Sequence, residues 1–265
     1  MNASILASGS TGNCTLVTEG ETRILIDAGI SARRILEALR GCGTDAAELT
    51  AILVTHEHSD HIKGLEVLLR RCSAPVYAVR PVADALCRMV PGARERLIVP
   101  EPDCAALIGE TAVTPFLVPH DSAGCCGYRI SGETGSFGCC TDLGVVTEDV
   151  RCALTGVDCA LIESNHDLTM LRTGPYPAFL KKRIRSEKGH LSNDDAAALA
   201  VYLTQTGTGA LILGHLSRHN NTPGEALGTV QRALDAAFDP DCRPSLWAAP
   251  ENGGLRIEIG ACVRC

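Results

Sequence analysis

Aromatic residues are scarce in this chain, and a long apolar run is missing. Phe, Trp and Tyr make up 3% of the 265 residues, so the core must be built mainly from Ala, Val, Ile and Leu. No stretch approaches the ~18 apolar residues that span a bilayer. The segment Met1–Ile5 lacks the basic and apolar regions of a secretory signal. We therefore expect a cytoplasmic protein without membrane association.

An excess of basic charge is also missing. The net charge of −7 argues against a nucleic-acid-binding surface that is basic throughout, although it is compatible with a local basic patch. The chain has 45% hydrophobic and 21% charged residues, as globular rather than disordered proteins do. No Pro- or Ser-rich linker divides it. We expect residues 1–265 to form a single domain.

Cysteine, in contrast, is abundant. The 14 cysteines include the adjacent pairs Cys125-Cys126 and Cys139-Cys140 and a terminal Cys262-x-x-Cys265. A reducing compartment disfavours a disulfide framework, so most of them are interpreted as small buried thiols of the core. A lone CxxC pair is a weak signal for zinc or redox chemistry, and a thiol-sensing role stays open.

Apolar β-rich runs alternate with helical patterns along the chain. The expected strands are Ser4–Ala7, Cys14–Thr18, Arg23–Ile26, Ala51–Thr55, Val76–Val79, Val113–Val118, Gly127–Ile130, Phe137–Thr141, Cys159–Ile162, Ala210–Leu213, Ser245–Ala248 and Leu255–Ile259. The expected helices are Ala32–Arg40, Ile62–Arg71, Val82–Met89, Pro177–Arg185, Asn193–Thr204 and Gly224–Phe238. This order indicates an α/β protein with mixed sheets flanked by helices.

The eight histidines are distributed unevenly. Three of them, His56, His58 and His61, fall within six residues directly after the apolar run Ile52–Val54. The remaining ones are His120, His166, His190, His215 and His219. Several of these also follow apolar β runs. Because side chains at the ends of neighbouring strands can meet at one sheet edge, we expect them to converge there.

The residue types in this pattern are those that bind metal ions. Imidazole is a neutral nitrogen ligand suited to Zn, Mn or Fe, and a carboxylate can bridge two cations. His56 and His58 can point the same way from an extended segment, and Asp60 and His61 can address a second ion. Asp142, at another strand end, is the candidate bridge. The sequence therefore predicts a pair of divalent cations.

These residues resemble the motifs of the metallo-β-lactamase fold superfamily, from about residue 4 to residue 260. The resemblance implies a four-layer αββα sandwich with the site at one sheet edge. It implies that Asp27 orients the metal-binding loop without binding metal. It implies one metal on His56, His58 and His120, a second on Asp60, His61 and His215, and Asp142 between them.

Finer motifs are similar to those of the YycJ/WalJ family within this superfamily. They are Leu6-Ala7-Ser8-Gly9-Ser10-x-Gly12-Asn13, Glu163-Ser164-Asn165-His166-Asp167, Gly189-His190-Leu191-Ser192-Asn193 and Gly214-His215-Leu216-Ser217-Arg218-x-Asn220-Asn221. Members are regarded as metal-dependent phosphodiesterases or exonucleases acting on DNA. By this resemblance Glu163 and Asn165 are expected to support the site.

Two cations that share a bridge can lower the pKa of water toward ~7 and make hydroxide available at neutral pH. We expect Asp60 to help orient this hydroxide. A leaving alkoxide needs a proton, and His166 and His190 are the candidate donors, since neither has a metal role. His219 is a weaker candidate and is otherwise a supporting residue.

A local basic segment favours a phosphodiester substrate. Lys181, Lys182, Arg183 and Arg185 precede His190, and Arg218 follows His215 by three residues. Such groups can anchor a DNA backbone or a terminal phosphate, although a basic run is often only a solvated helix face. A thioester or lactone hydrolase of the glyoxalase II kind and a non-catalytic metal- or thiol-sensing module are the alternatives. No obligate protein partner is expected.

Overall fold

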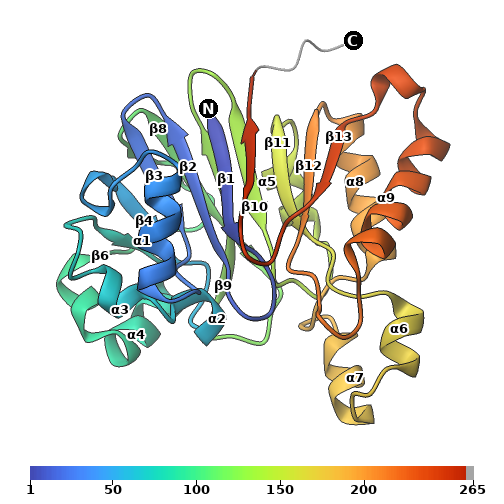
Figure 1. Ribbon diagram of the computed structural model, residues 1–265, viewed down its shortest axis with the longest axis horizontal. Helices are drawn as coiled ribbons and strands as arrows, with labels where there is room; N and C mark the ends of the chain where they lie inside the picture. The colour runs from blue at the N-terminus through green and yellow to red at the C-terminus, as the bar shows by residue number, and fades with distance from the viewer. Residues whose placement is uncertain (261–265) are drawn as a thin grey trace.

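The computed structural model describes residues 1–260, and these form two β-sheets that pack face to face (Figure 1). The first sheet has the spatial order β14 (Leu255–Glu258), β1 (Asn2–Ala7), β2 (Cys14–Glu19), β3 (Thr22–Ile26), β4 (Ala51–Leu53), β5 (Val76–Tyr77) and β6 (Leu97–Ile98). The second has the order β13 (Ser245–Ala248), β12 (Ala210–Gly214), β11 (Cys159–Glu163), β10 (Ser136–Cys140), β9 (Cys125–Ser131), β8 (Thr111–Val118) and β7 (Ala106–Ile108).

Helices cover the outer faces of both sheets. The α-helices are α1 (Ala32–Gly41), α2 (Ser59–Ile62), α3 (Leu65–Leu68), α4 (Arg80–Met89), α5 (Glu148–Leu154), α6 (Leu168–Thr173), α7 (Ala178–Ile184), α8 (Asn193–Gln205) and α9 (Pro223–Ala237). Helices α1 and α4 lie on the side of the first sheet and α8 and α9 on that of the second, while α6 and α7 extend beyond the layers at the lower right of Figure 1. The predicted αββα sandwich is confirmed.

Within residues 1–260, none of the helices combines the length and apolar character that a bilayer crossing requires.

The second sheet is buried on both faces. Side chains alternate along a strand, and Cys139 and Leu161 join the core between the sheets, whereas Cys140 and Ile162 join the core under α5, α8 and α9. This double burial explains why β11 reads as a continuous apolar run and not as an alternating pattern.

Most cysteines in residues 1–260 belong to these two cores. The buried ones are Cys14, Cys72, Cys125, Cys126, Cys139, Cys140 and Cys159. Burial raises the pKa of Cys126 and of Cys159 to about 12, so both stay protonated at physiological pH. They act as small apolar side chains, as interpreted from the sequence. The Cys262-x-x-Cys265 motif lies outside the described residues.

The helix expected over Ile62–Arg71 is instead two short helices, α2 and α3, which are interrupted at Gly64. The N–H of Gly64 donates to the carbonyl of Ala28 at 2.8 Å. A Cβ at this position would lie 2.2 Å from the carbonyl oxygen of Ile30. The close backbone contact therefore breaks the helix and docks it onto the loop that follows β3.

Candidate metal centre

The imidazole and carboxylate side chains of the sequence pattern meet at one edge of the two sheets. Strands β10, β11 and β12 are parallel to one another, so their carboxyl ends lie at the same edge. The residues that meet there follow or end a strand: His56, His58, Asp60 and His61 after β4, His120 after β8, Asp142 after β10, Glu163 at the end of β11 and His215 after β12. The convergence expected from the strand ends is present.

A residue shortly after the end of each of β3, β10 and β12 has a left-handed backbone conformation. Asp27, Asp142 and His215 have φ values of 59°, 58° and 54°. Residues with a side chain rarely adopt this region, although Asp and His tolerate it better than most. Each such residue costs on the order of 1 kcal/mol or more and is typically retained where function needs it. These turns aim the side chains across the sheet edge.

His56, His58 and His120 form the first group. Their ring nitrogens lie within 4.8 Å of one another, and Nε2 of His56 is 3.0 Å from Nδ1 of His58. Nδ1 of His120 donates to the carbonyl of Gly189 at 3.2 Å. This bond sets the tautomer and leaves Nε2 of His120 as a bare acceptor. The three rings can hold a cation.

Asp60, His61 and His215 form the second group, again with ligand atoms within 4.8 Å of one another. Oδ2 of Asp60 lies 3.6 Å from Nε2 of both His61 and His215. Asp142 stands between the groups: its Oδ2 is 3.2 Å from Nε2 of His61, and its Oδ1 is 3.9 Å from Nε2 of His120. This is the position of a bridge.

The donor set fits divalent cations. Nε2 of His120, Nε2 of His215 and Oδ2 of Asp142 are buried and lack a hydrogen-bond partner. A buried polar atom without a partner costs about 1–3 kcal/mol, and a cation would satisfy all three. Burial alone would raise the pKa of Asp142, but the neighbouring His215 and His61 hold it well below its usual range. The carboxylate is therefore anionic.

Asp27 contacts the His61 ring on the side that faces away from Asp142. Its Oδ2 is 2.7 Å from Nδ1 of His61, the ring nitrogen opposite to the one that faces Asp142. Its Oδ1 accepts from the backbone N–H of Thr55 at 2.9 Å. The carboxylate thus sets the orientation of the His61 ring, and Asp27 belongs to none of the groups of possible metal ligands.

Glu163 connects two histidine rings. Its Oε1 lies 2.8 Å from Nδ1 of both His190 and His215, and its Oε2 accepts from the N–H of Leu143 at 2.9 Å. Burial favours the neutral acid, yet His190 and His215 lower the pKa of Glu163 to about 2. Burial also disfavours a charged His190, but the Glu163 carboxylate raises the pKa of His190. The sequence indicated a supporting role for Glu163 without revealing that it joins both rings.

His166 is placed differently from the other predicted donor. Its side chain is buried outside the groups of possible metal ligands, and its Nδ1 has no hydrogen-bond partner. Burial lowers the pKa of His166 to about 4, so the ring is neutral at physiological pH. Asn165, beside it, donates from Nδ2 to the carbonyl of His215 at 2.9 Å. Asn165 therefore supports the strand end that carries His215.

Two of the predicted phosphate-binding arginines already have carboxylate partners. Arg218 pairs with Glu251, which also accepts from Thr11 Oγ1 at 2.9 Å. Arg183 pairs with Asp121, next to His120. A phosphate at either guanidinium would have to compete with the carboxylate. The sequence could not reveal these pairings, since the partners are 33 and 62 residues away.

The basic residues of α7 and its C-cap also differ in whether they already have a partner within the protein. Nζ of Lys181 donates to the carbonyls of Arg172 and Gly174 at 2.8 and 2.7 Å, which ties α7 to the end of α6. The side chains of Lys182 and Arg185 are exposed, and neither side chain makes a hydrogen bond or ion pair with another described residue. These two side chains remain available to an anionic partner.

A cavity of about 180 Å³ opens beside the cluster. Tyr176, Leu180 and Ile184 contribute the apolar part of its lining. The polar part comes from Ser10, Asp121, Asn165, Arg183, His190, His215 and Ser217. His219 is exposed, and its ring lies 5.6 Å from that of Tyr176. Of the residues predicted for the site, Asn165, Arg183, His190 and His215 therefore border a space that can receive a substrate.

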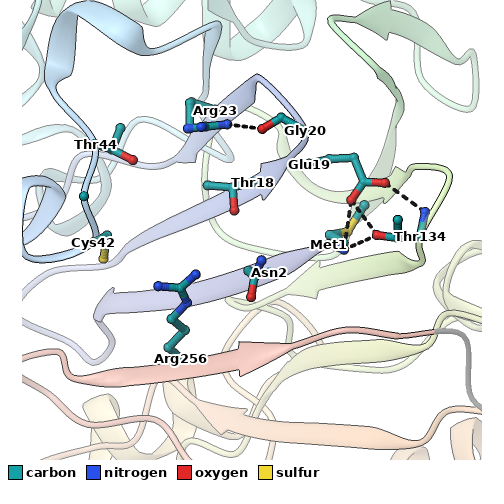
Figure 2. A pocket seen from close by; sticks show the side chains of 11 residues that line it. Met1, Asn2, Thr18, Glu19, Gly20, Arg23, Cys42, Thr44, Thr134 and Arg256 are labelled. Carbon is teal, nitrogen blue, oxygen red and sulfur yellow. Dashed lines mark hydrogen bonds and ion pairs between the residues drawn. The ribbon is translucent and has the colours of Figure 1, made fainter.

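A second, polar cavity of about 320 Å³ lies at the other ends of the first strands (Figure 2). Arg23 and Arg256 line it, and the amino group of Met1 pairs there with Glu19 at 2.9 Å. Glu19 also accepts from the N–H of Thr134 at 2.8 Å. None of the residues predicted for the site lines this cavity.

The loop that carries Asp60 packs directly on Gly29. A Cβ on Gly29 would lie 1.6 Å from the carbonyl oxygen of Asp60. Gly29→Ala is therefore expected to lower the free energy of unfolding by about 2 kcal/mol or more, because backbone has to move. Gly41→Ala is the control, since a Cβ at Gly41 meets nothing within 4 Å; its stability should be unchanged or up to about 1 kcal/mol higher. Denaturant unfolding measures both, and equal stability of the two variants would contradict the packing.

Comparison with known proteins agrees with this geometry. The profile of the β-lactamase superfamily domain matches residues 22–216. The exodeoxyribonuclease YycJ of Bacillus anthracis is 35% identical over 237 residues, which are 89% of each chain. The exodeoxyribonuclease WalJ of Streptococcus pneumoniae is 36% identical over 239 residues, 88% of each chain. The chain belongs to the YycJ/WalJ family of the metallo-β-lactamase superfamily.

Solved structures of this superfamily share the fold. YhfI of Bacillus subtilis superposes with a TM-score of 0.74 at 17% identity and covers 97% of this chain and 98% of its own. Zn²⁺-bound PqqB of Methylobacterium extorquens gives a TM-score of 0.72 at 16% identity, over 98% of this chain and all of its own. As a YycJ/WalJ-family protein with His and Asp clusters at the sheet edge, the chain is a metal-dependent hydrolase.

Proposed function

We propose that this YycJ/WalJ-family protein is a dinuclear-metal-dependent phosphodiesterase that removes nucleotides from a DNA end. The position of Asp142 carries the proposal, because its carboxylate lies within 4 Å of imidazoles from both groups. Its Oδ2 is 3.2 Å from Nε2 of His61, and its Oδ1 is 3.5 Å from Nε2 of His215 and 3.9 Å from Nε2 of His120. The names of the two relatives, both exodeoxyribonucleases, support DNA as the substrate. Its single-domain organisation and its cytoplasmic location stay predictions.

The proposed ligands follow the two groups. His56, His58 and His120 would hold one cation, Asp60, His61 and His215 the other, and Asp142 would bridge them. Zn²⁺, Mn²⁺ and Fe²⁺ all suit such nitrogen and oxygen ligands. When bound, two such ions supply positive charge for a phosphate and lower the pKa of water at neutral pH.

The side chains of the chain perform the remaining steps. The Asp60 side chain is partly exposed and reaches both His61 and His215, so it can accept a hydrogen bond from the attacking water and orient it. His190 is the proposed proton donor to the leaving oxygen. Glu163 engages its Nδ1, and the ring lines the cavity, so Nε2 is available to the substrate. His166 has no such path, because it does not line the cavity.

Phosphate contacts are assigned to the unpaired cationic side chains of α7 and of its C-cap. Lys182 and Arg185 are exposed and unpaired within the described part of the chain, so they can contact a DNA backbone without losing an internal partner. Arg183 and Arg218 would first have to leave Asp121 and Glu251. They are weaker anchors than the sequence indicated.

The test is the digestion of one oligonucleotide, labelled at its 5′ or its 3′ end, in the presence of Mn²⁺ or Zn²⁺. The wild-type protein is expected to release labelled mononucleotides early from one end only. The His58→Ala variant should lose this activity by about 10³-fold, since it removes a ligand of the first group. Hydrolysis of an acyl thioester or lactone, with no release from DNA, would contradict the proposal and select the acyl-hydrolase alternative.

A further inference from the structure

The cavity beside His190 has an apolar part, and none of the roles proposed above for the metal ligands and the proton donor requires apolar side chains there. It is formed by Tyr176 and by Leu180 and Ile184 of α7. Tyr176 and Leu180 are only partly buried. Within residues 1–260 the hydroxyl of Tyr176 has no hydrogen-bond partner. A polar contact inside the protein therefore does not explain this residue.

The segment that carries Tyr176 is held in place relative to the histidines. Lys181 ties α7 to the end of α6, and the Arg183–Asp121 pair ties α7 to the loop after His120. The Tyr176 ring packs edge-on against His219, at an interplanar angle of 62°. The apolar wall is therefore positioned before any substrate arrives. In Figure 1, α6 and α7 stand out from the layers.

We propose that Tyr176, together with Leu180, forms the subsite for the nucleobase of the terminal nucleotide. The inference rests on the proposed function and names the substrate form that this site takes. An aromatic ring stacks on any base, which suits an enzyme that degrades DNA without regard to sequence. Ser10, Asn165 and Ser217 line the same cavity and offer polar groups to the sugar and phosphate.

The size of the cavity determines which DNA ends fit. At about 180 Å³ it is smaller than the ~300 Å³ at which pockets for drug-sized ligands begin. A cavity of this size suits a single base better than a base pair. We therefore expect an unpaired end to be hydrolysed faster than a paired end.

The experiment compares two single-stranded oligonucleotides that differ only at the terminal nucleotide to be removed, which carries its base in one and is abasic in the other. For the wild-type protein, loss of the base should lower kcat/KM about tenfold or more. Tyr176→Ala should lower kcat/KM by a similar factor on the base-bearing substrate and leave the abasic one nearly unchanged. Tyr176→Phe should behave as wild type on both.

Phe179→Ala is the matched control. Phe179 is an aromatic residue of α7, three residues after Tyr176, with 76% of its surface exposed, and it does not line the cavity. Its removal should therefore leave the preference for the base intact. If Tyr176→Ala lowers kcat/KM equally on both oligonucleotides, or if the wild-type protein does not distinguish them, the subsite is wrong while the proposed function stands. If neither oligonucleotide is hydrolysed, the proposed function itself fails.

Discussion

Asp142→Asn is expected to lower kcat by about 10³-fold or more and to reduce the metal content from two equivalents to one or none. Asparagine keeps the shape of the side chain and tolerates the left-handed backbone at this position, where φ is 58°. The substitution therefore removes mainly the negative charge that separates two imidazole groups. Elemental analysis after dialysis, together with single-turnover hydrolysis of DNA, measures both effects.

Asp103→Asn is the control for this substitution. Asp103 has the same backbone conformation, with φ of 59°, but it lies outside the groups of possible metal ligands. Its replacement should leave both metal content and kcat unchanged. Two full equivalents of metal in Asp142→Asn would show that this carboxylate is not the bridge, whatever the rate.

Glu163→Gln is expected to lower kcat by about 10²-fold at saturating metal. The carboxylate oxygen Oε1 accepts from His190 and His215 at 2.8 Å each, and a neutral amide can neither orient both rings nor stabilise a charged His190. Because Glu163 raises the pKa of His190, the rate that needs protonated His190 is present below that pKa and falls as the pH rises through it. In the variant this alkaline decline should begin at lower pH.

Glu19→Gln provides the comparison for Glu163→Gln. Glu19 is also a buried carboxylate, but it pairs with the Met1 amine and Thr134 at the opposite edge of the sheet (Figure 2). Its replacement should lower stability and leave the pH profile of kcat unchanged. An unaltered alkaline limb in Glu163→Gln would contradict the assignment of His190 as the proton donor.

Much of the fold was predictable because it depends on local patterns. All twelve expected strands overlap strands of the structure. Ser192, which directly precedes the expected helix Asn193–Thr204, caps it by accepting from the N–H of Asp195 at 3.2 Å. The short strands β6 and β7 and the helices α5 and α6 were not predicted. They are two to seven residues long, and packing against neighbours stabilises such elements more than intrinsic propensity does.

The candidate metal ligands were recognisable for a different reason. Cation coordination requires particular side chains, and a cluster such as His56-x-His58-x-Asp60-His61 is rare without that use. The substrate contacts were harder to predict. Arg218 was expected to hold a terminal phosphate, but it pairs with Glu251, which lies 33 residues away in the chain.

The sequence by itself determined an α/β protein with mixed sheets flanked by helices and the identity of the imidazoles and carboxylates of the site, since periodicity and spacing are properties of neighbouring residues. The four-layer order of the sheets and helices was implied only by the resemblance to the metallo-β-lactamase fold superfamily. Only the tertiary structure decided which of these groups face one another. It placed Glu163 between His190 and His215, separated His166 from the cavity and brought Tyr176 beside it. The physical reason is that hydrogen bonds, ion pairs and cavities depend on distances in space, and folding sets these distances between residues far apart in the chain.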